Sequence, residues 1–187
     1  MGYDSTLFYD TYEYYAKYRP NVPGEVVQII VEQFDIKPVD RILDIGCGTC
    51  QIAIAMDGKC DEMVCLDSDL EMLKQAKREI ERMNLKQKII LVNCYAEDLI
   101  KRKSGLKIFK LATICRAFHW MDQNKVLTDL DSLISEDGGI AILVMEVFGL
   151  AKKNGNMQLK RLFKNIWARN VMLGKEPSKN HLNHGRI

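Results

Sequence analysis

Apolar and polar residues alternate along the chain in a way that predicts strands and helices in turn. Five apolar runs predict buried strands, at residues 40–45, 62–67, 88–93, 110–115 and 138–147. Segments with helical periodicity lie between and around them, at residues 5–18, 24–34, 49–56, 69–84, 122–134 and 156–172. Residues 96–103 predict a short helix or turn. Apolar strands that alternate with helices indicate a parallel sheet covered on both faces.

We therefore predict an α/β fold, a doubly wound, Rossmann-like parallel sheet of about five strands flanked by helices. In such sheets, ligands bind outside the carboxyl ends of the strands, where the strand order reverses. We expect a single domain over residues 1–187, which is a usual domain size. It would comprise an N-terminal helical cap (1–35), a cofactor-binding core (36–150) and a basic C-terminal helix and tail (151–187).

The net charge of +2 is unevenly distributed. Residues 151–187 carry nine basic residues and one acid, Glu176, whereas the preceding part is net acidic. A basic tail can bind nucleic acid, but it is more often a solvated helix face, so we do not expect a nucleic-acid partner. No apolar run approaches the roughly 18 residues of a membrane helix, and the N-terminus lacks the features of a signal peptide. We expect a cytoplasmic protein.

The six cysteines lie mostly in or beside predicted strands, which suits small, reduced and buried side chains. Cys47 and Cys50 form a C-x-x-C pair, and Cys60 and Cys65 follow. This pattern leaves open a four-thiolate zinc site or a redox pair. Because the second pair is C-x4-C and Cys65 lies inside an apolar strand, we expect no metal site.

The segment "RILDIGCGTC", residues 41–50, places a glycine-rich loop directly after a strand that carries an acid, Asp44. Such loops usually approach a ligand closely, because glycine has no Cβ. A dinucleotide site requires G-x-G-x-x-G/A, and Gln51 stands at the last position of that pattern. Asp67 ends the next strand, 21 residues after Gly46, where an acid can accept hydrogen bonds from ribose hydroxyls.

Asp44 distinguishes between the possible ligands. A carboxylate about 4 Å from a phosphate charge costs on the order of 4 kcal/mol at an effective dielectric of 20. S-adenosylmethionine has no phosphate, and its methionine end carries an ammonium group beside a cationic sulfur. The acid that opposes a dinucleotide therefore favours S-adenosylmethionine as the cofactor.

Several segments together resemble the class I S-adenosylmethionine-dependent methyltransferases, and more closely their small-molecule branch. The resemblance covers about residues 9–175 and rests on motifs that occur in the family's order and spacing. They are "ILDIGCGTC", "VCLDSDLEML", "VNCYAEDL", "ATICRAFHWMD" and "ISEDGGIAIL", with "YEYYAKYRP" at the N-terminal helix. The resemblance implies S-adenosylmethionine as cofactor and a small molecule as methyl acceptor.

The resemblance also implies roles for the residues that bind the cofactor. Asp44, Gly46 and Gly48 would hold its methionine end, and Asp67 would bind its ribose. At the adenine and along the cofactor it places Ser68, Ala96, Glu97, Arg116 and Ala117. Arg19, which ends the N-terminal helix, would pair with the methionine carboxylate, or it is only a cation at a helix C-terminus.

On the acceptor side the resemblance implies Phe118, His119 and Trp120, with Tyr15 of the aromatic N-terminal helix. His119 is the histidine of the predicted core and is the candidate general base. These residues also have structural interpretations. His119 can be a hydrogen-bonded core histidine, Phe118 and Trp120 can be core residues, and Tyr15 can belong to a packing stripe.

The chain departs from the family pattern at three points. Cys50 replaces the usual third glycine of the first motif, and Tyr95 replaces the acid that often binds the adenine amino group. No run after residue 150 alternates like a strand, so the usual last two strands are absent and the chain resembles a C-terminally truncated family member. The fifth strand would then form an exposed edge, covered by the last helix or by a second copy in a homo-oligomer.

The function predicted from the sequence is methyl transfer from S-adenosylmethionine to a small-molecule acceptor. A non-catalytic or degenerate cofactor-binding domain is the alternative, suggested by the three departures. A nucleic-acid methyltransferase lacks support because the sequence contains no N-P-P-Y or similar motif. A dinucleotide oxidoreductase is opposed by Asp44 and Gln51.

Overall fold

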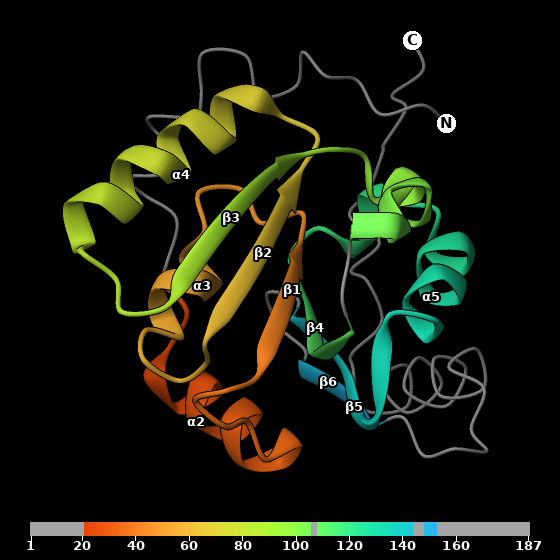
Figure 1. The fold of residues 1–187 in the computed structure, drawn as a ribbon, viewed down its shortest axis with the longest axis horizontal. Coiled ribbons are helices and arrows are strands. Elements are labelled where there is room, and N and C mark those ends of the chain that lie inside the picture. Colours follow the sequence, from red (N-terminus) through yellow and green to blue (C-terminus); the bar gives the residue numbers. More distant parts are fainter. Residues whose placement is uncertain (1–20, 106–107, 144–147, 153–187) are drawn as a thin grey trace, which may run out of the picture.

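The computed structural model describes residues 21–105, 108–143 and 148–152, which form a central sheet with helices on both faces (Figure 1). The strands are β1 (Arg41–Ile45), β2 (Glu62–Asp67), β3 (Lys88–Asn93), β4 (Phe109–Cys115), β5 (Ile134–Leu143) and β6 (Phe148–Lys152). Their order is β3-β2-β1-β4-β5-β6, and the first five strands pair in parallel. The predicted doubly wound α/β fold is thus confirmed. The strand order reverses between β1 and β4, which is where a ligand crevice is expected.

The helical elements are α2 (Gly24–Phe34), α3 (Gln51–Ala55), α4 (Leu70–Met83), η1 (Ala96–Gly105), η2 (Phe118–Trp120) and α5 (Gln123–Asp131). One face of the sheet is covered by α2, α3 and α4, whose buried residues share a core with Ile42 and Met63. The opposite face is covered by η1, η2 and α5, which pack on Leu43 and Val64. Burial of both faces explains why the strands read as nearly continuous apolar runs. Every helix in these described ranges is too short or too polar to cross a membrane.

Helix α4 follows the predicted periodicity and begins at the predicted cap. The Asp69 Oδ1 atom accepts hydrogen bonds from the backbone N–H groups of Glu71 (2.8 Å) and Met72 (3.2 Å). These bonds satisfy donors that the first helical turn would otherwise leave unpaired. The helix ends at Asn84, which adopts the left-handed conformation.

Strand β6 corrects the sequence prediction at the edge of the sheet. It pairs antiparallel with β5, from Leu143 opposite Phe148 to Gly139 opposite Lys152. The edge of β5, which was predicted to be exposed, is therefore paired with β6. The predicted boundary at residue 150 falls inside β6. This strand was missed because its five residues, which include Gly149, carry little periodic signal of their own, and the open backbone groups of β5 supply the pairing.

Two further boundaries differ from the prediction. The helix expected at 122–134 ends at Asp131, and β5 begins at Ile134, four residues before the glycines that were predicted to start it. The pairing of Ile134 with Phe109 continues the sheet before a register shift in β4. The predicted helices at 5–18 and 156–172 and the basic tail lie outside the described residues.

Candidate functional site

The glycine loop after β1 is folded by three positions of positive φ. Gly46, Gly48 and Cys50 have φ values of 66°, 54° and 62°. The backbone N–H groups of Gly46 and Cys47 both donate to the Leu66 carbonyl, at 2.8 and 3.0 Å, which ties the loop to the end of β2. A Cβ on Gly46 would lie 2.5 Å from the Cβ of Ala117, so only glycine allows this approach to the segment that follows β4.

Asp44 is buried at the carboxyl end of β1, with 1% of its surface exposed. Its Oδ1 accepts a hydrogen bond from the Thr113 hydroxyl at 2.7 Å, and its Oδ2 has no partner among the described residues. Burial raises the pKa of Asp44 from its ordinary value of 3.8 to about 8; the Thr113 hydrogen bond opposes this, and nearby Cys50 and Asp67 add to it. A buried carboxyl oxygen without a donor is costly, so this atom is suited to a cationic or hydrogen-bonding ligand group.

Asp67 is the last residue of β2, and its carboxylate binds the backbone of the glycine loop. Its Oδ2 accepts from the Gly48 N–H at 2.7 Å and its Oδ1 from the Asp69 N–H at 2.9 Å. Burial raises the pKa of Asp67, while the two backbone donors act in the opposite direction. Each carboxylate oxygen still has a lone pair, since a carboxylate offers about four acceptor positions. Asp67 can therefore bind two hydroxyl groups while it keeps the loop in place.

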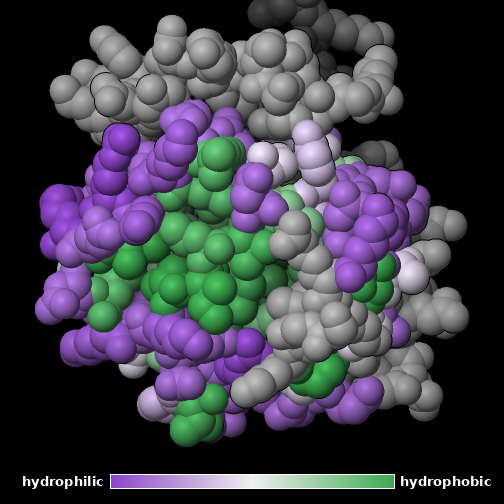
Figure 2. Space-filling view, turned by 45° about the horizontal axis from the view of Figure 1, so that its top comes forward, coloured by the Kyte–Doolittle hydropathy of each residue, from purple (hydrophilic) through white to green (hydrophobic). Residues whose placement is uncertain are grey.

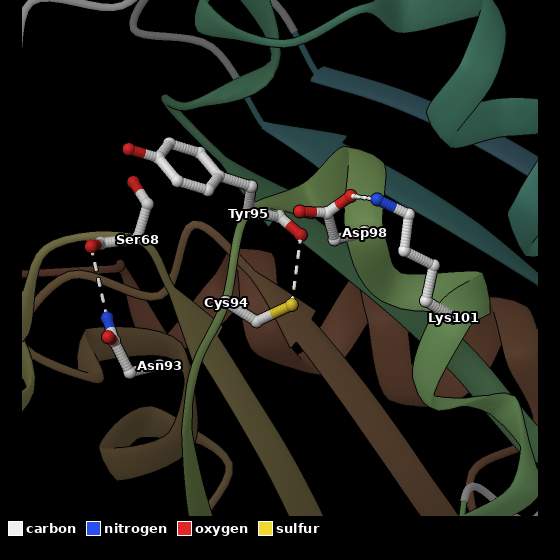
Figure 3. Close-up of a pocket in the computed structure, with 6 residues that line it drawn as sticks. All are labelled: Ser68, Asn93, Cys94, Tyr95, Asp98 and Lys101. Atoms are coloured by element: carbon white, nitrogen blue, oxygen red, sulfur yellow. Dashed lines mark hydrogen bonds and ion pairs between the residues drawn. The ribbon is translucent and has the colours of Figure 1, made fainter.

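A cavity of about 420 Å³ opens at Ser68 and Asn93, where β2 and β3 end (Figure 3). Its lining residues are Ser68, Asn93, Cys94, Tyr95, Asp98 and Lys101. The Asn93 side-chain amide donates to the carbonyls of Asp67 (3.1 Å) and Ser68 (3.0 Å), which fixes the rim. Tyr95 is half exposed, so its ring is accessible to a planar ligand.

In Figure 2, which turns the upper part of Figure 1 toward the viewer, apolar residues gather in the middle of the face with hydrophilic residues around them.

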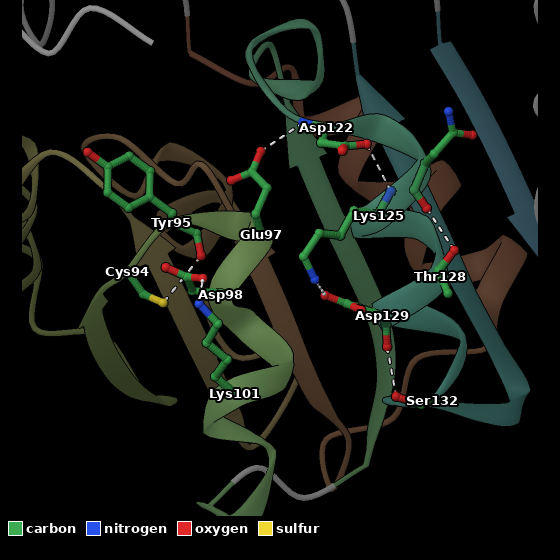
Figure 4. A network of polar contacts seen from close by, with 11 residues as sticks. Cys94, Tyr95, Glu97, Asp98, Lys101, Asp122, Lys125, Thr128, Asp129 and Ser132 are labelled. Carbon is green, nitrogen blue, oxygen red and sulfur yellow. Dashed lines mark hydrogen bonds and ion pairs between the residues drawn. The ribbon is translucent and has the colours of Figure 1, made fainter. Parts of the chain in front are cut away.

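The side chains of the two residues predicted to border the adenine after Tyr95 are not part of the lining of this cavity. Ala96 is buried in the core. The Glu97 Oε1 atom accepts a hydrogen bond from the Asp122 N–H at 2.7 Å (Figure 4). Asp122 in turn caps α5, because its Oδ1 atom accepts a hydrogen bond from the Lys125 N–H at 3.1 Å. Glu97 therefore connects the loop after β3 to the start of α5.

The segment after β4 separates its aromatic residues. Phe118 is buried with 5% of its surface exposed and packs in the core with α5. His119 and Trp120 are exposed, and their ring centroids lie 4.7 Å apart. Arg116 adopts the left-handed conformation with φ of 56°, and its N–H donates to the Leu143 carbonyl at 2.6 Å. Of the predicted acceptor residues described here, His119 and Trp120 are the ones that a ligand can reach. Arg19 and Tyr15 lie outside the described residues.

Three cysteines meet beneath the glycine loop. The thiols of Cys47 and Cys50 are in hydrogen-bond contact with each other and with the thiol of Cys65 in β2. None of the six cysteines is in a disulfide. In the part of the chain that the structure describes, no group of histidine, cysteine and acidic side chains has a geometry that could hold a metal ion.

Sequence reasoning did not assign Thr113 or Asn93 to the site. Thr113 is a fully buried hydroxyl in the otherwise apolar run of β4, which is a signal that a buried polar partner exists. The parallel pairing of β1 and β4 identifies that partner, because Asp44 lies opposite Thr113 in the register. Asn93 ends β3 at the same edge as Asp67 ends β2, and their pairing places them side by side.

Comparison with known proteins adds independent support to this description. A family model described as "Methyltransferase domain" matches residues 42–138, more than half of the chain. A Saccharomyces cerevisiae protein named "Probable S-adenosylmethionine-dependent methyltransferase CRG1" is 26% identical over 128 residues, which cover 68% of this chain and 43% of that protein. A Methanobrevibacter smithii protein named "Probable cobalt-precorrin-6B C(15)-methyltransferase (decarboxylating)" is 22% identical over 131 residues, 68% of this chain and 67% of that protein.

The fold also has solved counterparts. The crystal structure of an S-adenosylmethionine-dependent methyltransferase from Clostridium acetobutylicum superposes with a TM-score of 0.56 at 20% identity, over 70% of this chain and 54% of that one. At this identity the likeness concerns the fold. The chain spans 43% of the yeast relative and about half of the Clostridium protein.

Proposed function

This chain belongs to the class I S-adenosylmethionine-dependent methyltransferases, and we propose that it transfers the methyl group of S-adenosylmethionine to a small-molecule acceptor. The cofactor, when bound, supplies a methyl group already activated on a cationic sulfur. The protein's contribution is then to bind, to orient and to exclude water.

Asp44 is the observation that carries the proposal. Its Oδ2 is buried at the glycine loop without a partner among the described residues, and its carboxyl can take up negative charge. The ammonium group of S-adenosylmethionine is a donor of the right charge for this atom, whereas a pyrophosphate would be repelled by it. The residues present therefore fit this cofactor. Thr113 holds Asp44 in place from β4.

The remaining cofactor contacts follow from the edge of the sheet. Asp67 would accept the ribose hydroxyls with the lone pairs that Gly48 and Asp69 leave unused. Ser68 and Tyr95 line the neighbouring cavity, where the exposed Tyr95 ring offers a stacking surface for adenine in place of a carboxylate. Glu97 would position the segment between β4 and α5, because its carboxylate accepts a hydrogen bond from the Asp122 N–H.

Three of the residues that the resemblance assigns to the cofactor remain parts of this proposal. Ala96 would contribute backbone groups near the adenine. Arg116 and Arg19 would lie along the cofactor, and Arg19 would pair with the methionine carboxylate.

The acceptor side of the proposal depends on His119 and Trp120. Both are exposed directly after β4, at the strand that adjoins β1 in the sheet. An exposed indole beside an imidazole is suited to a small and partly apolar acceptor, with His119 able to accept a proton from a hydroxyl nucleophile. The name of the Methanobrevibacter relative, which refers to a small-molecule precorrin, is consistent with this acceptor class. The proposal includes a cytoplasmic location, supported by six cysteines that form no disulfide.

Calorimetric titration of the purified chain with S-adenosylhomocysteine tests the cofactor assignment. We expect micromolar binding by the wild type and no binding by Asp67→Asn. The asparagine side chain has one oxygen that accepts hydrogen bonds, whereas the carboxylate has two. Asp137→Asn is the matched control, because Asp137 pairs with Lys110 at the other end of β4. Absence of binding to a demonstrably folded chain would contradict the proposal and favour a degenerate domain. Binding without transfer of a labelled methyl group to any of a panel of small acceptors would favour a non-catalytic cofactor-binding domain.

A further inference from the structure

The three-thiol cluster of Cys47, Cys50 and Cys65 lies directly under the loop that would hold the methionine end of the cofactor. Cys65 is brought there by β2, where it is the register partner of Asp44. Cys50 and Cys65 are fully buried, while Cys47 retains 9% of its surface exposed. Cys47 is therefore the thiol of the cluster with a route to small solutes.

The backbone between Cys47 and Cys50 is a tight turn. The Cys50 N–H donates to the Cys47 carbonyl at 2.9 Å, the hydrogen bond that closes a four-residue turn. In such turns the first and last Cα atoms lie within about 7 Å. A disulfide requires a Cα separation of roughly 4.4–6.8 Å. The loop can therefore form a Cys47–Cys50 disulfide with local adjustment, without movement of a helix or strand.

The three thiols also shift one another's pKa. Hydrogen bonds from the thiols of Cys47 and Cys65 lower the pKa of Cys50 well below its ordinary value, although burial opposes this. Burial, together with the contact to Cys50, raises the pKa of Cys47. A thiol whose pKa is lowered thus lies beside one whose pKa is raised, so a sulfur that is oxidised there has a neighbouring thiol to trap it.

We propose that Cys47 and Cys50 are a redox modification site that takes a hydroperoxide and forms a disulfide, with Cys65 as a positioning residue. In the first step the sulfur of Cys47, the thiol of the pair with exposed surface, attacks the peroxide, the O–O bond breaks, and the proton of the thiol completes the alcohol or water that leaves. In the second step the Cys50 thiol displaces water from the Cys47 sulfenic acid and the S–S bond forms. The peroxide is reduced by two electrons and the two thiols are oxidised by two.

The modification weakens cofactor binding, a consequence that depends on the proposed function. Drawing the two sulfurs to bonding distance shifts Gly48, whose N–H donates to Asp67, and so changes the loop that would hold the methionine end of the cofactor. Reduction by a thiol restores the loop.

Peptide mapping of the full chain tests the modification without reference to the cofactor. Trypsin cleaves after Arg41, Lys59 and Lys74, so residues 42–59 contain Cys47 and Cys50 and residues 60–74 contain Cys60 and Cys65. After hydrogen peroxide and alkylation, we expect peptide 42–59 to be unalkylated and lighter by two hydrogen atoms, and dithiothreitol should reverse both changes. Alkylation of both cysteines after peroxide, or a link that joins the two peptides, would overturn the proposal.

Titration with S-adenosylhomocysteine before and after peroxide tests the consequence. We expect affinity to fall by roughly tenfold on oxidation, about 1.4 kcal/mol, and to recover with dithiothreitol. Cys50→Ala should bind S-adenosylhomocysteine with the same affinity before and after peroxide. If Cys50→Ala does not fold, Cys47→Ala provides the same test. Cys60→Ser is the control and should keep the wild-type response, since burial and three nearby acids raise the pKa of Cys60 to about 12.

The outcomes separate the two proposals. A disulfide with unchanged affinity overturns the regulatory consequence. A reduced chain that does not bind S-adenosylhomocysteine counts against the proposed function and leaves the peptide result to decide the modification.

Discussion

Asp44 and Thr113 face each other across β1 and β4, and the Thr113 hydroxyl donates to the Asp44 carboxylate at 2.7 Å. The pair lies at the point where the strand order reverses, so the topology and the chemistry of the site coincide. One carboxyl oxygen is satisfied by the fold, and the other is left for a ligand. Because burial raises the pKa of Asp44 to about 8, the carboxyl is protonated near neutral pH when no cation faces it.

Cofactor binding should therefore release a proton. Below about pH 7 the ammonium group of S-adenosylhomocysteine is charged, while Asp44 must lose its proton to pair with it. We expect affinity to rise by up to about tenfold per pH unit between pH 5.5 and 7. Calorimetry in buffers of different ionisation enthalpy should show close to one proton released for each molecule bound at pH 6.5.

Asp44→Asn is the control for this prediction. The amide keeps a hydrogen bond with Thr113 but cannot ionise, so the variant should bind more weakly and without the pH slope. An equal slope in wild type and variant would assign the proton to another group, and a flat wild-type profile would mean that Asp44 does not pair with the ligand.

The same carboxyl makes the stability of the ligand-free protein depend on pH. The pKa of Asp44 in the folded state is higher than in the unfolded chain, so the folded state binds more protons between about pH 4 and 8. The free energy of unfolding should therefore be highest at the acidic side of this window and fall as pH rises, by up to about 1.4 kcal/mol per pH unit. Asp67, whose pKa is also raised, acts in the same direction.

Urea denaturation of the wild type and of Asp44→Asn at pH 5, 6, 7 and 8 measures this effect. The two proteins should have similar stability at pH 5, and the variant should be the more stable one at pH 8. Parallel curves for the two proteins across the series would show that Asp44 does not titrate in this range.

Much of the fold could be predicted because its strands are buried on both faces. The run Glu62–Asp67 is apolar between its two acidic ends, and the structure begins and ends β2 at those residues. Asp69 marked the start of α4 because a carboxylate there accepts from the helix N-terminus. Gly46 could be assigned to the loop because a residue without a Cβ permits a tight turn and a close approach, and the structure adds that the close approach includes Ala117.

The remaining features depend on contacts that a linear pattern does not contain. The partner of Asp44 follows from the register of β4, and the contact of Glu97 with Asp122 joins loops that are 25 residues apart. Strand β6 exists because β5 offers unpaired backbone groups, and its own residues carry little signal. Phe118 and Trp120 are two residues apart in one motif, and only the packing of α5 shows which of them is buried.

Gly46→Ala should disrupt the site through sterics alone. The added Cβ would lie 2.5 Å from the Ala117 Cβ and 3.0 Å from the Met121 Cε, at a φ of 66°. Overpacking of this kind typically costs about 1–3 kcal/mol, and the positive φ adds to it. We expect loss of S-adenosylhomocysteine binding together with a lower midpoint in urea.

Gly24→Ala provides the matched control, since nothing lies within 4 Å of a Cβ built there, at the start of α2. It should leave stability unchanged or raise it by up to about 1 kcal/mol. Wild-type binding by Gly46→Ala would mean that the loop can move away from Ala117 and that the close approach is dispensable.

Trp120→Ala and Phe118→Ala should separate acceptor binding from packing. Trp120 is 46% exposed, so its truncation should change the urea midpoint little and leave the affinity for S-adenosylhomocysteine as in the wild type. If Trp120 contacts the acceptor, the loss should appear in kcat/KM for the acceptor. Phe118 is 5% exposed in the core beside α5, so Phe118→Ala should lower stability by about 3–5 kcal/mol. Wild-type kcat/KM of Trp120→Ala for an identified acceptor would exclude Trp120 from the acceptor site. The same acceptor tested with His119→Gln would then show whether the imidazole contributes to turnover independently of Trp120.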